Sequence, residues 1–154
     1  MRSFNHRLRN LLLGGLIALG AQANGQTPET PEGRDERIAI TLDANERALM
    51  LAGMRTYLES VHEIITALAA NKTAPVHDAA KRSGAAMLQD VSPLTALKLP
   101  PGFVSMSFDT HDKFDRLAEK ASKPTSRNEL LRDLDAILAN CTACHASFKF
   151  VAPR

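Results

Sequence analysis

The sequence lacks several features that large classes of protein need. It has no Trp and only one Tyr among its 154 residues. No basic run is interleaved with aromatic side chains, which argues against a nucleic-acid-binding surface. No apolar run approaches the ~20 residues of a membrane-spanning helix, so no stable span is expected in the mature chain. A chain so poor in aromatic side chains also suggests that something else fills part of its core.

The first 23 residues have the layout of a secretory signal peptide. Three arginines precede the apolar run LLLGGLIALG, and the small residues of AQA follow at the cleavage positions. The signal carries three of the nineteen basic residues and none of the seventeen acidic ones, so the mature chain is close to neutral. We therefore expect residues 1–23 to be removed after export to the periplasm.

Beyond the signal, residues 24–41 read as a linker and lead-in segment, and residues 42–154 as one helical domain. NGQTPETPEGRDER is rich in Pro, Gly and charge, as mobile linkers are. The apolar run IAITL that follows cannot build a sheet alone. We therefore predict that it packs as a lead-in to the first helix.

Apolar residues at three- and four-residue spacing predict four helices, over residues 43–70, 75–88, 110–121 and from 126 through Phe148. Capping boxes mark two of their starts, Asp43 with Glu46 and Ser126 with Glu129. The prolines between residues 90 and 107 predict a long connection. We expect an all-α fold, most simply an antiparallel four-helix bundle in which the first helix begins beside the end of the last.

The motif CTACH, at residues 141–145, contains the only two cysteines of the chain. A disulfide between Cys141 and Cys144 would close a very small loop and remove little entropy. A thioredoxin-like redox pair needs a cysteine at a helix amino terminus after a strand, whereas this pair lies near a helix end. A zinc site would need a fourth ligand beside Cys141, Cys144 and His145, from His62, His77 or His111.

The spacing C-x-x-C-H is typical of a c-type haem attachment site. Each thiol would form a thioether with a haem vinyl group, and His145 would bind the iron as proximal ligand. Cys141 and His145 are four residues apart, which places them on one face of a helix. Export agrees with this interpretation, because bacterial haem is attached outside the cytoplasm. The motif therefore favours covalent haem c over the other three interpretations.

The position of this motif on the last helix of a four-helix chain resembles the class II cytochromes c, the cytochrome c′ group. Class I cytochromes place the motif near the amino terminus. The resemblance covers residues 43–150 and includes ANKTAPVHDAAK, which is similar to the turn into the family's second helix. Phe148 and Lys149 match the aromatic and basic residues that follow the family's ligand histidine, although arginine is the commoner basic residue there.

The resemblance also implies where a sixth iron ligand would lie. Low-spin members of the family present a methionine from the first helix, whereas cytochromes c′ present an apolar side chain and bind small gases. Met50 and Met54 both lie on the inward stripe of the predicted first helix, where methionines are ordinarily core residues. We expect Met54 to be the distal ligand, with Met50 as the alternative, and Met87 and Met106 to be packing residues.

The most direct functional prediction is a periplasmic electron carrier with one haem c, and no enzyme. A thioether opposite His145 would stabilise ferrous iron and suit electron transfer between periplasmic redox proteins. A five-coordinate protein that binds NO or CO is the alternative, and a subunit of a larger periplasmic oxidoreductase is a third. The family often forms homodimers through its first helix. His62 and His77 are expected at the surface, and His111 at a helix cap or near a haem propionate.

Overall fold

Helices make up most of residues 35–153, the part of the chain that the computed structural model describes. The helical elements, in chain order, are α1 (Ala44–Ala69), α2 (Ala74–Lys81), the 3-10 helix η1 (Ala85–Asp90), α3 (Pro93–Ala96), α4 (Pro101–Ala121) and α5 (Arg127–Ser147). Two short strands, β1 (Ile38–Thr41) and β2 (Phe148–Val151), precede and follow them. The prediction of a mostly helical fold is confirmed. The predicted signal peptide over 1–23 and the linker up to residue 34 lie outside the described residues.

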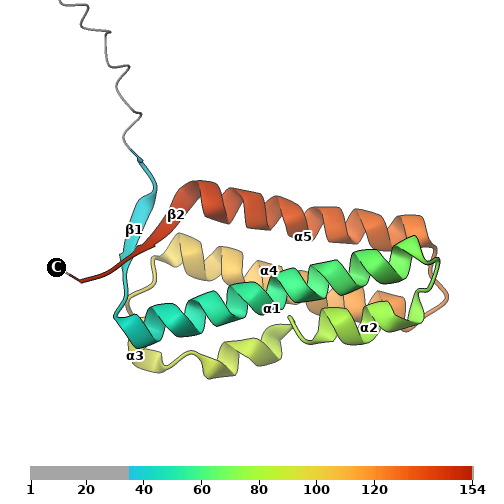
Figure 1. Cartoon of the computed structure of the whole chain (residues 1–154), viewed down its shortest axis with the longest axis horizontal. Helices are drawn as coiled ribbons and strands as arrows, with labels where there is room; N and C mark the ends of the chain where they lie inside the picture. The colour runs from blue at the N-terminus through green and yellow to red at the C-terminus, as the bar shows by residue number, and fades with distance from the viewer. Residues whose placement is uncertain (1–34, 154) are drawn as a thin grey trace, which may run out of the picture. The chain divides into compact units, whose positions relative to one another are not determined.

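The long helices lie side by side, with α1 and α4 running in one direction and α5 in the other (Figure 1). Helix α4 packs against α2 and α5, and α1 packs against α2 and more lightly against α5. The beginning of α1 therefore lies beside the end of α5 that carries CTACH, as the sequence predicted. None of the helices within residues 35–153 is long and apolar enough to span a bilayer.

Both predicted capping boxes are present at the starts of α1 and α5. The side chain of Asp43 accepts the backbone N–H of Glu46 at 2.9 Å, and the Glu46 carboxylate accepts the N–H of Asp43 at 2.9 Å. Ser126 and Glu129 make the same reciprocal pair at α5. Each box satisfies two N–H groups that a helix start otherwise leaves without a partner. These local signals fix where the two helices begin.

The predicted second helix over 75–88 is wrong in its second half, because α2 ends at Lys81. In a continuous helix the N–H of Ala85 would donate to the Lys81 carbonyl. Here it donates instead to the Asp115 carboxylate of α4 at 2.8 Å. A Cβ on Gly84 would collide with the same carboxylate, so a glycine is needed at this close approach. A contact from a distant helix therefore ends α2, and the chain continues as η1.

The predicted third helix over 110–121 is too short, because α4 begins at Pro101. Proline lacks an N–H, but the first turn of a helix has no intrahelical acceptor for that group. Pro100 and Pro101 therefore start the helix rather than interrupt it. The predicted long connection before it also contains one helical turn, α3, which Ser92 caps by accepting the N–H of Thr95 at 3.1 Å.

The run IAITL, expected to pack as a lead-in to the first helix rather than to join a sheet, contains the strand β1. β1 pairs in parallel with β2, with Ile38 opposite Phe148 and Thr41 opposite Val151. The N–H of Leu42 extends the ladder by donating to the Val151 carbonyl at 3.1 Å. The partner strand lies at the other end of the chain, where residues after Ser147 were expected to continue the last helix. Local sequence gives no signal for a pairing across this separation.

Buried apolar side chains form two clusters, and CTACH lies between them. The larger cluster joins α1, α2, α4 and α5 and includes Ile64, Phe114 and Leu130. The smaller one lies near the sheet and contains Ile40, Leu42, Met50 and Phe103. Cys141 packs against the larger cluster and Cys144 against the smaller one. The motif therefore spans the gap between two packed regions.

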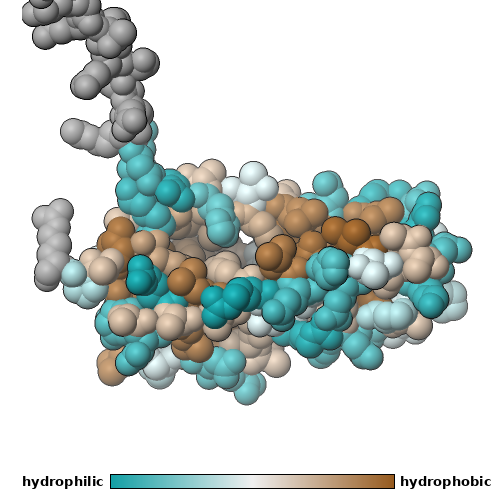
Figure 2. Space-filling model, in the orientation of Figure 1, coloured by the Kyte–Doolittle hydropathy of each residue, from teal (hydrophilic) through white to brown (hydrophobic). Residues whose placement is uncertain are grey.

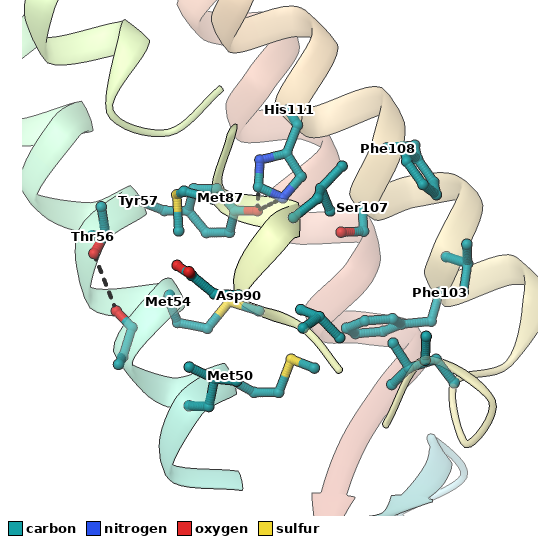
Figure 3. A pocket seen from close by; sticks show the side chains of 18 of the residues that line it. Met50, Met54, Thr56, Tyr57, Met87, Asp90, Phe103, Ser107, Phe108 and His111 are labelled. Atoms are coloured by element: carbon teal, nitrogen blue, oxygen red, sulfur yellow. Dashed lines mark hydrogen bonds between the residues drawn. The ribbon is translucent and has the colours of Figure 1, made fainter. Parts of the chain in front are cut away.

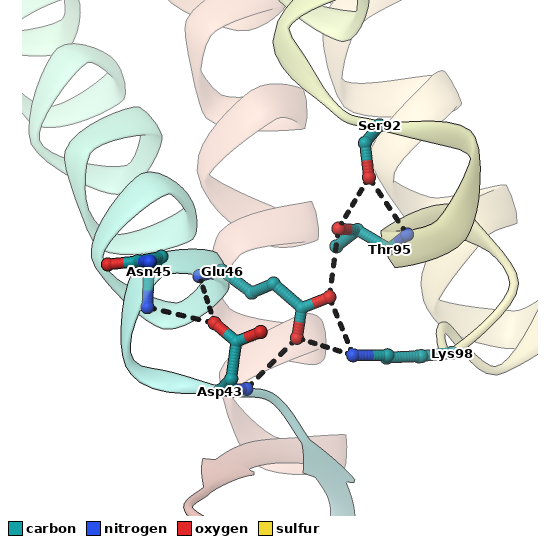
Figure 4. A network of polar contacts seen from close by, with 6 residues as sticks. All are labelled: Asp43, Asn45, Glu46, Ser92, Thr95 and Lys98. Atoms are coloured by element: carbon teal, nitrogen blue, oxygen red, sulfur yellow. Dashed lines mark hydrogen bonds and ion pairs between the residues drawn. The ribbon is translucent and has the colours of Figure 1, made fainter.

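The carboxylate of Glu46 connects the start of α1 to the connection before α4 (Figure 4). Besides the Asp43 N–H, it accepts the Thr95 hydroxyl at 3.0 Å and the Lys98 ammonium at 2.7 Å. The Lys98 hydrogen bond, followed by that of the Asp43 N–H, lowers the Glu46 pKa below its ordinary value of 4.5. The network thus ties α1 to α3 through one ionised group.

This network makes stability depend on pH in a defined direction. A carboxylate whose pKa is lower in the folded state contributes stability above the unfolded pKa and loses it as pH falls. We expect Glu46→Gln to lower the urea midpoint at pH 7, and the difference from wild type to shrink as pH falls below about 4.5. Glu59→Gln, at an exposed position on the same helix, is the control. A difference that is equal at pH 7 and pH 3.5 would contradict the assignment.

A candidate cofactor site at the end of α5

Helix α5 carries CTACH in its last two turns because its buried face continues through the motif. Leu130, Leu134 and Ile137 lie on that face, and Cys141 follows at the next four-residue interval. Cys141 and Cys144 are half-buried, whereas His145 is exposed. The helix ends two residues later, at Ser147. Three residues suited to haem attachment, two cysteines and one histidine, are thus brought together on a single helix end.

Both cysteines are free thiols in the structure. Burial raises the pKa of Cys141, and burial together with the neighbouring Cys141 raises the pKa of Cys144. Reactive redox cysteines show the opposite, a lowered pKa near a helix amino terminus. The arrangement therefore gives no support to a thioredoxin-like pair or a structural disulfide.

The thiols open onto a cavity of about 450 Å³ between α1, α4 and α5. Figure 2 shows a hollow between α1 and α5, with hydrophobic side chains around it. Most of the lining is apolar, with Leu58 and Val61 from α1, Phe103 from α4 and Leu138 from α5. His145 lines the same cavity as Cys141 and Cys144. The cavity wall therefore offers two thiols and one imidazole, and most of the remaining lining is apolar.

The structure separates the two candidate methionines of α1. Met54 is half-buried and lines the cavity that holds the cysteines and His145. Met50 is buried in the smaller apolar cluster and does not line this cavity. Met106, expected to be a packing residue, also lines it, from α4. A thioether is therefore present on the helix that faces α5, and Met54 supplies it.

A second cavity of about 510 Å³ adjoins the first, on the side of η1 and α3. The two share four lining residues, Met54, Tyr57, Phe103 and Ser107. Figure 3 shows Met50, Met54 and Met87 around this second space, with Tyr57 and His111 at its wall. A flat ligand attached at the cysteines could therefore extend past Met54 into an adjoining apolar space.

The remaining histidines do not complete a metal site with CTACH. His62 is exposed, and His77 is half-buried and pairs with Asp78 at 2.8 Å. Within residues 35–153, no group of three or more His, Cys, Asp or Glu side chains converges as metal ligands would. The zinc interpretation therefore gains nothing from the geometry.

The structure excludes one of the two positions expected for His111, the helix cap. Because α4 begins at Pro101, His111 lies in the middle of the helix and cannot cap it. Its side chain is buried and contacts the Tyr57 hydroxyl and the Ser83 carbonyl. Sequence reasoning missed Tyr57, although a buried tyrosine hydroxyl usually needs a partner and only a few polar side chains could supply one.

Phe148 and Lys149, three and four residues after His145, have different roles. Phe148 begins β2 and packs on Phe103 with ring centres 5.5 Å apart. The ammonium of Lys149 turns to the lead-in segment, where it contacts the Asp35 carboxylate at 3.2 Å and its carbonyl at 3.1 Å. Arg37 also donates to the His145 carbonyl at 3.4 Å. The lead-in segment thus holds the chain immediately after the proposed ligand.

No protein-family model, curated protein or solved structure matches this chain. Its function therefore has to be inferred from the arrangement of residues at the site itself.

Proposed function

We propose that the protein is a periplasmic electron carrier, a class II-like cytochrome with one covalent haem c. Cys141 and Cys144 would attach the haem, His145 would be the proximal ligand and Met54 the distal ligand. One observation carries the proposal: Met54 lines the same apolar cavity as both thiols and His145. The antiparallel course of α1 and α5 supports the four-helix bundle that the resemblance implies.

The residues of the cavity fit a haem in chemical type. Two thiols are available for thioethers, an imidazole and a thioether are available for iron, and apolar side chains line most of the wall. Bound haem would supply a one-electron couple between ferric and ferrous iron, and a methionine ligand favours the ferrous state. The chain's own part is to attach the group, present the two ligands and keep water away from it.

The proposal is tested by producing the full-length chain in a bacterium that attaches haem to exported proteins. We expect haem to stay with the chain after denaturation, because thioether bonds survive it. The absorption spectrum should be low-spin, with a methionine-to-iron charge-transfer band. A chain without covalent haem would overturn the proposal. A high-spin ferric spectrum with ready binding of NO or CO would replace the carrier with the gas-binding alternative.

The proposal extends to a homodimer formed through α1. Leu51, Leu58 and Ile65 are exposed at seven-residue intervals on this helix, a spacing that suits pairing with a second helix. Leu51 and Leu58 also border the cavity with the thiols, so the dimer face would begin at the edge of that cavity. Leu131 and Leu138 of α5 are also exposed and seven residues apart. Figure 2 shows hydrophobic side chains gathered over these two helices. A second copy of the chain, related by a twofold axis, would cover one such face with an identical one.

We expect Ile65→Glu to convert this dimer to a monomer, because a carboxylate in an apolar seam is left without water. Ile65 does not line the cavity with the thiols, so haem attachment should be unchanged. Analytical ultracentrifugation measures the mass in solution. Leu97→Glu is the matched control, because Leu97 is exposed after the end of α3 and belongs to neither α1 nor α5. A wild-type protein that sediments as a monomer would contradict the prediction.

A further inference from the structure

The hydroxyl of Tyr57 and the imidazole of His111 form a short hydrogen bond at the wall shared with the second cavity. The Tyr57 oxygen lies 2.6 Å from Nε2 of His111. The other ring nitrogen, Nδ1, lies 2.9 Å from the Ser83 carbonyl oxygen. Figure 3 shows the two side chains meeting between α1 and α4. The contact joins helices that are far apart in the sequence.

These partners assign the proton on each nitrogen. A carbonyl oxygen only accepts hydrogen bonds, so Nδ1 must carry the hydrogen that reaches Ser83. A neutral imidazole then has its lone pair on Nε2, where it can accept the hydroxyl of Tyr57. The phenolic proton thus already points at a nitrogen base.

The two members of the pair differ in burial, because His111 is buried whereas Tyr57 is half-buried and borders both cavities. His111 is 4% exposed, and the Tyr57 ring stacks on buried Phe114 with an interplanar angle of 3°. Burial raises the pKa of Tyr57 well above its usual value. If the Tyr57 phenol lost an electron but kept its proton, it would become a radical cation. A positive charge without a counter-charge is costly in an apolar region. A nearby base removes that cost.

We propose that Tyr57 and His111 form a proton-coupled redox pair. Tyr57 transfers one electron to a strong one-electron oxidant at the adjoining cavities, and its phenolic proton moves to Nε2 of His111. The O–H bond of Tyr57 breaks, an N–H bond forms on His111, and the oxidant is reduced by one electron. The products are a neutral phenoxyl radical and an imidazolium, and a returning electron reverses both transfers.

An acidic neighbour is present to stabilise the imidazolium. Asp115 lies four residues after His111 on α4, so it faces the same side of the helix. Burial opposes the ionisation of Asp115, but hydrogen bonds from the Ala85 N–H and Lys81 lower its pKa overall. The positive charge would therefore form close to a carboxylate.

This pair goes beyond the proposed electron carrier and does not require haem. Its role would be to collect oxidising equivalents that reach the cavities before they attack methionine thioethers, which oxidise readily. Met54, which borders both cavities, is one turn from Tyr57 on α1.

The composition of the chain makes the test unusually specific. Tyr57 is the only tyrosine and there is no tryptophan, so a phenoxyl radical has a single source. The full chain would be oxidised with a photo-excited ruthenium polypyridyl complex and a sacrificial electron acceptor. Electron paramagnetic resonance of frozen samples should show a neutral phenoxyl radical that is absent in Tyr57→Phe. Its formation should be slower in D₂O, because the proton moves with the electron.

Replacement of the base provides the second arm. We expect His111→Gln to slow radical formation on the order of tenfold, the effect of one strong hydrogen bond on a barrier. His62→Gln, which removes an exposed histidine of α1, is the control and should have no effect. Equal rates in wild type and a folded His111→Gln would overturn the proposal. If His111→Gln does not fold, the wild-type protein still tests the proposal. A rate of radical formation that is unchanged in D₂O would overturn it, and so would the absence of a radical signal.

Discussion

Met54→Leu is expected, if the chain is the haem carrier that we propose, to change a low-spin spectrum to a high-spin one and to allow carbon monoxide to bind. Leucine fills nearly the same volume as methionine, so the cavity wall is kept while the thioether is lost. The methionine-to-iron charge-transfer band should disappear. The reduction potential should fall on the order of 100 mV, a fraction of the ~0.8 V range that axial ligands control. Absorption spectroscopy and a redox titration measure both effects.

Two other methionines serve as matched controls for this substitution. Met50 lies in the smaller apolar cluster, and Met106 lines the cavity from α4. We expect Met50→Leu and Met106→Leu to keep the low-spin spectrum, with a loss of stability below about 1.5 kcal/mol. If either of them abolishes the charge-transfer band while Met54→Leu keeps it, the assignment of the distal ligand is wrong.

Cys141→Ala/Cys144→Ala is expected to give a chain that loses haem and cooperative folding together. Without haem, the mostly apolar wall of a cavity of about 450 Å³ would have no group packed against it. Apolar surface left unpacked in this way destabilises the fold, and an ordinary domain has only ~5–15 kcal/mol of stability in total. Water entering the cavity instead would contact its apolar wall. Circular dichroism during thermal unfolding should therefore show a broad transition or none.

Single substitutions separate the loss of haem from the loss of a thiol. Cys141→Ala and Cys144→Ala each leave one thiol for attachment, so a partly stabilised protein with one thioether is expected. An unchanged midpoint and an equally sharp transition in the haem-free double variant would show that the helices fold without a cofactor. That result would contradict the idea that a core with few aromatic side chains depends on haem.

Local signals predicted the parts of this structure that depend on neighbouring residues. The capping boxes at Asp43 and Ser126 gave the starts of α1 and α5. Apolar spacing gave only part of their buried faces, because some apolar residues with the same spacing are exposed, namely Leu58, Ile65, Leu131 and Leu138. The predicted lengths of α2 and α4 were wrong, for different reasons. Asp115 ends α2 through a contact between helices, which no local pattern records. Pro101 was treated as an interruption although it fits the first turn of α4.

At the candidate site, too, the features set by neighbouring residues were predicted, and those set by contacts between helices were not. Spacing within CTACH placed both thiols and the imidazole on one helix end, and the structure places them on one cavity. The choice between Met50 and Met54 depended on how α1 and α5 lie against each other, which the sequence left open. The contact between Tyr57 and His111 was missed, because it joins residues 54 positions apart.

The pairing of β1 with β2 constrains the order of events during folding. Ile38 of β1 pairs with Phe148 of β2, so β1 has no partner until nearly all of residues 35–153 are available. Closing so long a loop is entropically costly, and contacts of this range tend to form late. CTACH directly precedes β2 in the chain. The haem attachment that we propose and the closure of the strand pair would therefore belong to the same late stage, and a chain released before that stage would lack both.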